Sequence, residues 1–265
     1  MINEQERIIR KSQGYDIGFE LNGKKYWLNS DTWNNEKEVR LFQETGLRSF
    51  RETTGNKNLV LYNPKYFSQV RGSLLYIGTV EKDIPQPINM SSAYTMFALQ
   101  KAIQFDLSSW DMSNVLCLYG MFSSCDNLQT VNLDGWDVKN VLEFNCMFIH
   151  CKRLQALDLS NWKTGNGVVY CLMFADCEEL HTLDLSNWNM SKGLDLRNMF
   201  HDCKSLTSLN LENWEVNINA NIKRLFDGCD VLYEKYDTNN NSVLLKRIIK
   251  SSNANRKPLE QLNTF

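Results

Sequence analysis

Two hydrophobic patterns with different periods alternate along the central half of the chain. The first has the form Leu-x-x-Leu-x-Leu-x-x-Trp, as in Leu180, Leu183, Leu185 and Trp188. Its Leu-x-Leu centre alternates apolar with polar positions, which predicts a short strand. The second pattern, across residues 118–125, places apolar side chains at i, i+3, i+4 and i+7. This spacing predicts one face of a helix.

Both patterns recur at intervals of 26 residues. The tryptophan column is Trp110, Trp136, Trp162, Trp188 and Trp214, and the cysteine column is Cys125, Cys151, Cys177, Cys203 and Cys229. A strand followed by a helix at this period lies within the range of a leucine-rich repeat. The sequence therefore predicts an α/β fold, a leucine-rich-repeat solenoid with parallel strands on the concave face and short helices on the convex face.

The flanking segments lack the repeat and are predicted to cap its ends, because a solenoid must cover its terminal cores. Residues 1–90 are expected to form an α+β N-terminal cap or accessory domain, residues 91–232 the solenoid, and residues 233–265 a helical C-terminal cap. In the first segment, Asn22-Gly23 between alternating apolar residues predicts a type I′ hairpin. Asp31 is expected to cap a helix that turns Val39 and Phe42 inward.

Two short apolar runs, residues 59–62 and 74–77, read as further strands of the N-terminal segment. At the other end, residues 242–250 read as a short helix that combines apolar with basic positions. Both observations fit the predicted caps.

Residues 96–229 resemble the BspA-like leucine-rich repeats, in the variant of mycoplasma-type surface lipoproteins. The motifs that carry the resemblance run from Leu183 to Ser191 and from Met199 to Cys203. The resemblance implies a bacterial protein with a binding or adhesion surface, of a family whose targets vary and whose members are typically exported.

Composition and charge restrict the function classes. The chain has 29 basic and 31 acidic residues, a formal net charge of −2, which argues against a globally basic nucleic-acid binder. No apolar run approaches the ~18 residues that span a membrane. The polar start, residues 1–7, has no apolar segment behind it and does not read as a secretory signal. A cytoplasmic location is expected, with a surface or secreted one as the alternative if a leader is missing.

The cysteines and histidines do not form a recognisable catalytic or metal motif. Cysteines that share one repeat position point the same way on stacked repeats, so they are expected to be buried thiols and not disulfides. There is no Cys-x-x-Cys pair with zinc-ligand spacing. His150 and His201 lie beside Cys151 and Cys203 in sequence but must face away from them. We expect no catalytic residue, no metal and no cofactor.

The polar positions between the inward leucines form columns that are predicted to bind a partner. The candidate residues are Asp106, Asn132, Asp134, Asp158, Asp184, Asn210 and Glu212. The fifteen positions of these columns hold five carboxylates and neither lysine nor arginine. Residues 91–230 have a net charge of −7, against +2 for residues 1–90 and +3 for residues 231–265. The columns are either a solvated sheet face or an acidic surface for a basic partner.

The sequence therefore predicts a non-catalytic protein–protein interaction module. It would be a cytosolic binder or inhibitor of another protein, acting through the acidic concave face or the N-terminal domain. The expected partner is a protein with a basic surface; direct contact with nucleic acid or membrane is not expected. Three alternatives remain open: a mobile-element inhibitor of a host nucleic-acid-binding defence enzyme, a surface adhesin, and an enzyme with its site in residues 1–90.

Overall fold

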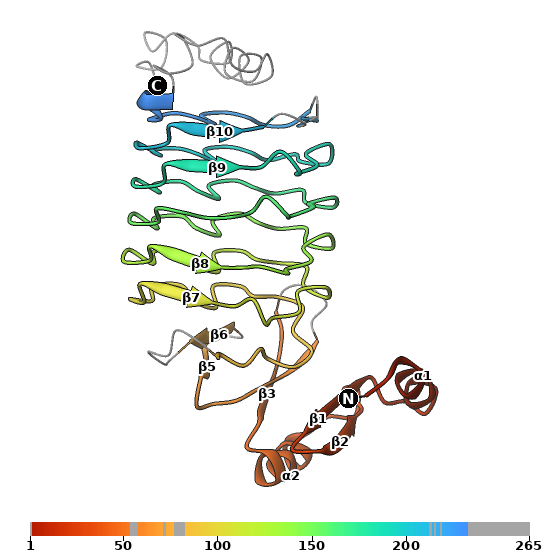
Figure 1. The fold of residues 1–265 in the computed structure, drawn as a ribbon. Coiled ribbons are helices and arrows are strands. Elements are labelled where there is room, and N and C mark those ends of the chain that lie inside the picture. Colours follow the sequence, from red (N-terminus) through yellow and green to blue (C-terminus); the bar gives the residue numbers. More distant parts are fainter. Residues whose placement is uncertain are drawn as a thin grey trace, which may run out of the picture.

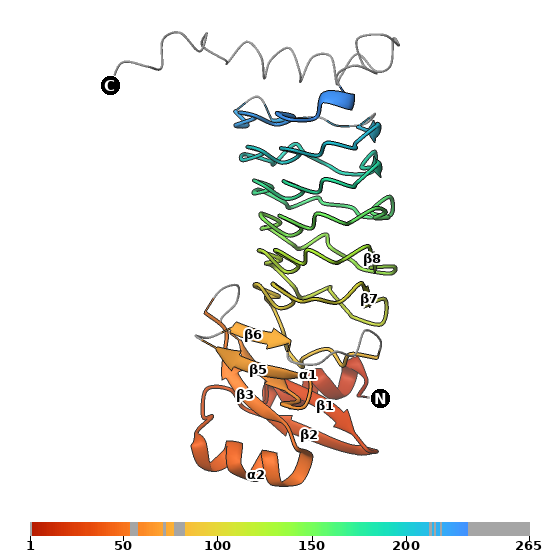
Figure 2. The same cartoon turned by 90° about the vertical axis from the view of Figure 1, so that its left-hand side faces the viewer.

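The computed structural model describes residues 2–53, 58–70, 73–76, 83–211, 214, 216–217 and 219–232. An N-terminal part of helices and small sheets lies at one end of the molecule, and a stack of coils extends from it (Figure 1). We use the word coil for one 26-residue repeat of this stack. The coils lie one above another in a straight column (Figure 2).

The N-terminal part begins with helix α1 (Glu4–Ser12), the antiparallel strands β1 (Ile17–Leu21) and β2 (Lys24–Leu28), and helix α2 (Asn35–Thr45). The turn between the strands, Asn22-Gly23, has φ values of 50° and 74°. Two left-handed residues in sequence are what a type I′ turn requires. The predicted hairpin is confirmed.

Helix α2 differs from its prediction in both its start and its buried face. Asn34, and not Asp31, caps the helix, because its side chain accepts the N–H of the third helical residue. Leu41 is the buried residue of the helix, whereas Val39 and Phe42 are 56% and 39% exposed. The rest of the protein covers only a narrow stripe of α2, so fewer of its apolar residues are buried than their spacing in the sequence predicted.

Two further antiparallel pairs connect the N-terminal part to the stack. Strand β3 (Arg48–Arg51) pairs with β4 (Leu59–Tyr62), and β5 (Phe67–Val70) pairs with β6 (Ser73–Tyr76). Strands were predicted at β4 and β6, and the structure adds their partners. Strand β4 contributes to two cores. Val60 and Tyr62 belong with Phe50 to the continuous core of the coils, whereas Leu59 and Leu61 belong to a smaller separate core with side chains of β1 and α2.

A buried carboxylate ties strand β3 to the first coil. Glu52 accepts hydrogen bonds from the backbone N–H groups of Ser91 (2.9 Å) and Ser92 (2.7 Å), and from the Ser91 hydroxyl. Desolvation by burial outweighs these bonds and raises the pKa of Glu52. The junction therefore depends on a polar contact that excludes water.

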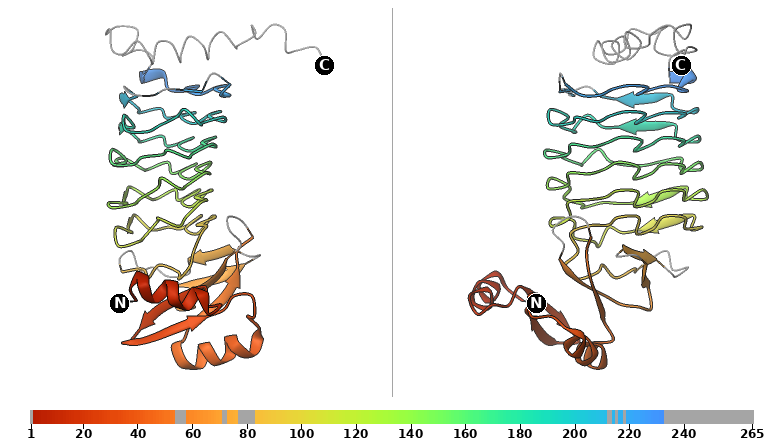
Figure 3. Two further views of the ribbon diagram at one scale, coloured as in Figure 1. Left: turned by 90° about the vertical axis from the view of Figure 1, so that its right-hand side faces the viewer. Right: turned by 180° about the vertical axis from the view of Figure 1, so that it is seen from behind.

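Two lines of parallel pairing hold successive coils together. The first contains β7 (Gln104–Asp106) with β8 (Thr130–Asn132), and β9 (Thr182–Asp184) with β10 (Ser208–Asn210). The second line is a series of isolated parallel bridges outside the named strands. It joins Ser92, Cys117, Glu143, Val169, Asp195 and Asn221. Figure 3 shows the stack of coils from two further sides.

The segments predicted to be helices, such as residues 118–125, form turns. Within residues 118–125, the even-numbered residues donate their backbone N–H groups to carbonyls of the next coil at 2.8–3.0 Å. Residues 121, 123 and 125 donate to the carbonyl three residues earlier at 2.9–3.2 Å. Gly120 and Ser124 have φ values of 56° and 58°, and equivalent positions repeat this left-handed conformation. In an α-helix, each backbone N–H after the first turn donates to the carbonyl four residues earlier in the same helix. The alternation of bonds in these segments is therefore incompatible with an α-helix.

The predicted fold class, an α/β leucine-rich-repeat solenoid, is therefore wrong. Within the described part of residues 83–229 there is no helix on any side, and the strands form short two-stranded sheets. The straight stack does not give the strands a concave face (Figure 2). The predicted C-terminal helical cap, residues 233–265, lies outside the described residues. No helix in the described part of the chain is long and apolar enough to cross a membrane.

The repeated side chains form buried columns at right angles to the coils. Phenylalanine rings of successive coils stack with centroids 5.2–5.8 Å apart. Each repeat cysteine donates its thiol hydrogen to the backbone carbonyl of a phenylalanine in the preceding coil, at 2.9–3.2 Å. A buried thiol is small enough for this close approach and leaves no donor unpaired. These columns explain why the sequence keeps its period.

Truncation of one stacked ring should destabilise the whole stack. Phe174 is fully buried between Phe148 and Phe200, so Phe174→Ala removes contacts with both neighbouring coils. We expect a loss of about 3–5 kcal/mol in the free energy of unfolding, measured by urea denaturation. Ile103→Ala is the control, because Ile103 is 53% exposed and its loss should cost at most about 0.5 kcal/mol. Equal costs for both variants would contradict a core built from stacked columns.

Candidate functional site

The predicted partner-binding residues lie along one side of the stack, which we call the strand face. The structure aligns Asp106 with Asn132 and Asp184 with Asn210 in parallel pairs. Asp158 lies between these pairs, because Thr130 of β8 bridges Ala156 of its coil. Asp134 is exposed in the turn after β8. Glu212 was predicted at the same level of the last coil and lies outside the described residues.

The central column of the strand face also has a structural role that the sequence analysis did not identify. Asp158 Oδ1 accepts the backbone N–H of Ser160 at 3.0 Å and its hydroxyl at 2.7 Å. Asn132 accepts the N–H of Asp134 at 3.1 Å in the same geometry. This is an Asx turn, for which Asp and Asn are equally suited. The turn therefore explains why both residue types occupy this column.

The hydrogen bonds keep the column charged. The Ser160 hydroxyl, followed by the Ser160 backbone N–H, lowers the pKa of Asp158 below its usual value. The backbone N–H of Ser186 makes the largest contribution to a lowered pKa at Asp184. Both carboxylates are exposed and ionised at neutral pH. One oxygen of each is held by the turn, and the strand face as a whole presents negative charge to solvent.

A groove of about 270 Å³ opens at the end of the strand face. Asp134, Asp137 and Asp158 line it together with the rings of Trp136 and Trp162. In the neighbouring coils the tryptophan Nε1–H donates to a leucine carbonyl of the preceding coil, at 2.8–3.3 Å. The buried Nε1 of Trp162 has no such partner in the described part of the chain. The coil at Trp162 thus lacks one contact that its neighbours make. Lys163 also lines the groove, and Lys139 pairs with Asp137 at 2.6 Å, so the groove contains both signs of charge.

The buried cysteines are not poised for nucleophilic chemistry. Burial raises the pKa of Cys125 to about 12 and that of Cys117 to about 11. Cys146 and Cys171 are partly exposed, and burial is again the first cause of their raised pKa values. A thiol needs a lowered pKa to act as a nucleophile at neutral pH. These four thiols have the opposite environment.

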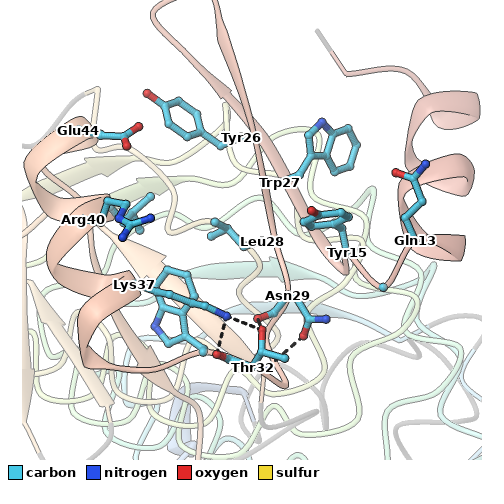
Figure 4. Close-up of a pocket in the computed structure, with 13 residues that line it drawn as sticks. Gln13, Tyr15, Tyr26, Trp27, Leu28, Asn29, Thr32, Lys37, Arg40 and Glu44 are labelled. Carbon is cyan, nitrogen blue, oxygen red and sulfur yellow. Dashed lines mark hydrogen bonds between the residues drawn. The ribbon is translucent and has the colours of Figure 1, made fainter.

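A second candidate site lies in the N-terminal part, where the sequence analysis named no residue. A cavity of about 440 Å³ opens between α1, β2 and α2. Figure 4 shows Gln13 and Tyr15 on the α1 side, the β2 side chains in the middle, and cationic side chains of α2 opposite. The lining residues are Gln13, Gly14, Tyr15, Tyr26, Trp27, Leu28, Asn29, Thr32, Trp33, Lys37, Arg40, Leu41 and Glu44.

The aromatic residues of this cavity are held by specific contacts. The ring of Trp27 lies over Gly18, where a Cβ atom would come within 2.3 Å of it. The guanidinium of Arg10 lies 5.7 Å from the Trp27 ring centroid and 5.9 Å from that of Tyr15. Lys37 donates to the carbonyl and hydroxyl oxygens of Thr32 at 2.8 and 2.6 Å (Figure 4). The clustering of aromatic residues between positions 15 and 33 was the available sequence signal.

Comparison with known proteins identifies a family. A family described as "Mycoplasma protein of unknown function, DUF285" matches residues 81–179 and 118–239, which together span more than half of the chain. The matched range contains the described coils and excludes the N-terminal cavity. No curated protein and no solved structure matches the chain.

The two serine contacts predict different titrations for two aspartates of the strand face. Ser160→Ala should raise the pKa of Asp158 toward the ordinary value of about 3.9, because it removes the largest cause of the lowered pKa. Ser186→Ala should shift Asp184 less, because the backbone N–H that dominates there is retained. Carboxyl NMR titration measures both.

Because both pKa values are lowered on folding, the stability that they contribute is present above about pH 4 and is lost as pH falls through the folded values. Equal shifts in the two serine variants, or a pKa of Asp158 at its ordinary value in the unchanged protein, would contradict the Asx-turn assignment.

Gly18 should be required for the position of Trp27. A methyl group at residue 18 would overlap the indole ring, so Gly18→Ala should move Trp27 and cost about 1–3 kcal/mol in the free energy of unfolding. Near-ultraviolet circular dichroism and urea denaturation measure the two effects. The matched control is Gly165→Ala, since no atom lies within 4 Å of a Cβ there. An unchanged aromatic signal in Gly18→Ala would show that the ring does not rest on residue 18.

Proposed function

The chain belongs to the Mycoplasma protein family of unknown function DUF285, whose match covers the coils, and we propose that these coils act as a non-catalytic protein-binding module. The strand face is the binding surface, and the partner is a protein with a basic surface. The family itself assigns no activity, so the support for this proposal comes from the geometry of the face.

The observation that carries the proposal is the column of ionised aspartates with no cation among them. Asp158 and Asp184 have lowered pKa values whose causes are serine and asparagine contacts and no basic side chain. Their second carboxylate oxygens are open to a partner, apart from a bond of 3.1 Å from Asn210 to Asp184. Negative potential of this kind speeds encounter with a basic surface and selects against acidic ones.

The rigidity of the face also supports a binding role. Backbone pairing joins successive coils from Ser92 to Asn221 on one side, and on the strand face it joins β7 to β8, Thr130 to Ala156, and β9 to β10. The side chains of Asp158 and Asp184 are fixed by their own turns. A surface that is ordered before binding loses little conformational entropy when a partner arrives. The charges repeat once per coil, so the face best fits an elongated basic partner, such as a helix or strand with regularly spaced lysines or arginines.

The resemblance of residues 96–229 to BspA-like proteins is consistent with this proposal, although these residues do not adopt the predicted leucine-rich-repeat geometry. Members of that group are known as binding and adhesion surfaces. An adhesin and an intracellular inhibitor would use the same acidic face, so the proposal concerns the recognition chemistry and applies in either compartment.

Ligand binding in the N-terminal cavity is a second candidate function. Its volume of about 440 Å³ lies within the range of roughly 300–1,000 Å³ typical of ligand pockets, and aromatic and polar residues line it. Tyr15 and Arg40 are accessible lining residues that do not belong to the strand face. Their substitution therefore separates the two candidate sites.

Removal of charge from the strand face should weaken partner binding and leave the fold intact. The variant combines Asp106→Asn, Asp158→Asn and Asp184→Asn, because asparagine already makes the same turn at Asn132. Capture from a lysate of the source organism, followed by mass spectrometry and titration of the captured protein, should show about ten-fold weaker binding. This estimate assigns roughly 0.5 kcal/mol to each exposed charge pair.

The charge-matched control combines Asp31→Asn, Asp126→Asn and Asp230→Asn, three exposed aspartates outside the strand face. It should bind as the unchanged protein does, and the affinity of the unchanged protein should fall as salt is raised. Equal weakening in both triple variants would exclude a specific role for the strand face. Loss of binding in Tyr15→Ala with Arg40→Ala, and not in the strand-face variant, would favour the N-terminal cavity.

A further inference from the structure

The turns that precede the repeat cysteines bring together side chains that are far apart in sequence. His150, Asp176 and Asp202 occupy the same repeat position in three successive coils, at intervals of 26 residues. All three have positive φ, between 54° and 60°. Each donates its backbone N–H to the next coil at 2.8 Å. The backbone therefore fixes these positions one above another, with His201 beside Asp202.

The side chains of this group form a compact set of metal-ligand atoms. One donor atom each of Asp176, His201 and Asp202 lies within 4.8 Å of the other two. His201 Nδ1 is 3.2 Å from Asp202 Oδ2, and His150 Nδ1 is 3.1 Å from Asp176 Oδ2. The three side chains that converge are 25–35% exposed, so they are reachable from solvent without being fully hydrated.

The following coil leaves room for this group. Residue 228 occupies the equivalent position there, and it is glycine with a φ of 77°. A Cβ atom at residue 228 would lie 2.0 Å from Asp202 Oδ1. The Asp202 carboxylate thus rests over the backbone of Gly228, in space that any other residue would fill.

We propose that Asp176, His201 and Asp202 bind a divalent transition-metal ion of the zinc type. One imidazole and two carboxylates suit Zn²⁺ and related ions, whereas sites built for Ca²⁺ use oxygen ligands. Ligand atoms lie about 2.0–2.2 Å from zinc, so the donors must approach one another by about 1 Å when the ion enters. Rotation of partly exposed side chains supplies this movement. Three protein ligands leave at least one position for water.

His150 acts on this site indirectly. Its Nδ1 contacts the Asp176 carboxylate and is not among the atoms that converge. A hydrogen bond from an outer residue orients a ligating carboxylate, and such residues affect metal affinity less than the ligands do. His150 is therefore a positioning residue. Substitution of each of the three histidines of the chain is expected to have a different effect on metal affinity.

A lysine at the edge of the group competes with the metal. Lys204 Nζ pairs with Glu178 at 3.1 Å, and its charge also interacts with the nearby carboxylates of Asp202 and Asp176. A cation at this distance offsets part of the negative potential that attracts a metal ion. Lys204→Gln should consequently strengthen metal binding, which distinguishes this site from metal bound elsewhere on the chain.

Titration of the metal-free full-length protein with Zn²⁺ and Co²⁺ tests the proposal. Calorimetry should show one ion per chain, and visible absorption of Co²⁺ should show imidazole coordination without a thiolate charge-transfer band. His201→Ala and Asp176→Asn should each weaken binding at least about ten-fold, and His150→Ala should weaken it less. Lys204→Gln should bind more tightly than the unchanged protein.

The matched control is His181→Ala, which removes an exposed histidine outside the group and should leave binding unchanged. Thermal unfolding without metal shows whether each variant folds, and added Zn²⁺ should raise the Tm of the unchanged protein but not of His201→Ala. Absence of stoichiometric binding in the unchanged protein, equal binding in His201→Ala, or a thiolate band would each overturn the proposal.

Discussion

The hydrogen bonds between successive coils are the interaction on which the rest of the structure depends. In the turn segments, every second backbone N–H donates to the next coil and the others close local turns. This alternation requires a left-handed residue every fourth position, a conformation that disfavours most side chains. Residues as different as Thr95, Cys146 and Leu172 adopt it because the bonds to the next coil fix the backbone around them.

A fixed register between coils turns each repeat position into a column. Inside the stack, this places phenylalanine on phenylalanine and lets each cysteine thiol reach a carbonyl of the preceding coil. On the surface, the same register collects polar side chains from different coils. The strand face and the group around Asp176 and His201 are both products of it, although one concentrates charge over five coils and the other places ligand atoms at a single point.

In the strand face, the same residues have a structural role and the proposed binding role. If these aspartates served only to bind a partner, other residues could replace them without loss of the turn. If they served only to form the turn, asparagine could occupy the position in each coil. The column contains both residue types, and the turn is present at Asp106, Asn132, Asp158 and Asp184 while the charge varies. The N-terminal part is connected differently, through a buried carboxylate at Glu52, and contributes a separate aromatic cavity.

The sequence alone determined the 26-residue period, the buried columns and the hairpin at Asn22-Gly23, because these depend on local spacing and turn chemistry. It predicted helices where the chain forms turns. Apolar residues at i, i+3, i+4 and i+7 lie on one side of a helix and also on one side of these turns. Only the tertiary structure shows that half of the backbone N–H groups donate to carbonyls of the next coil. The same contacts between coils bring His201 to Asp176 and leave Gly228 beneath Asp202, which no spacing along one repeat could reveal.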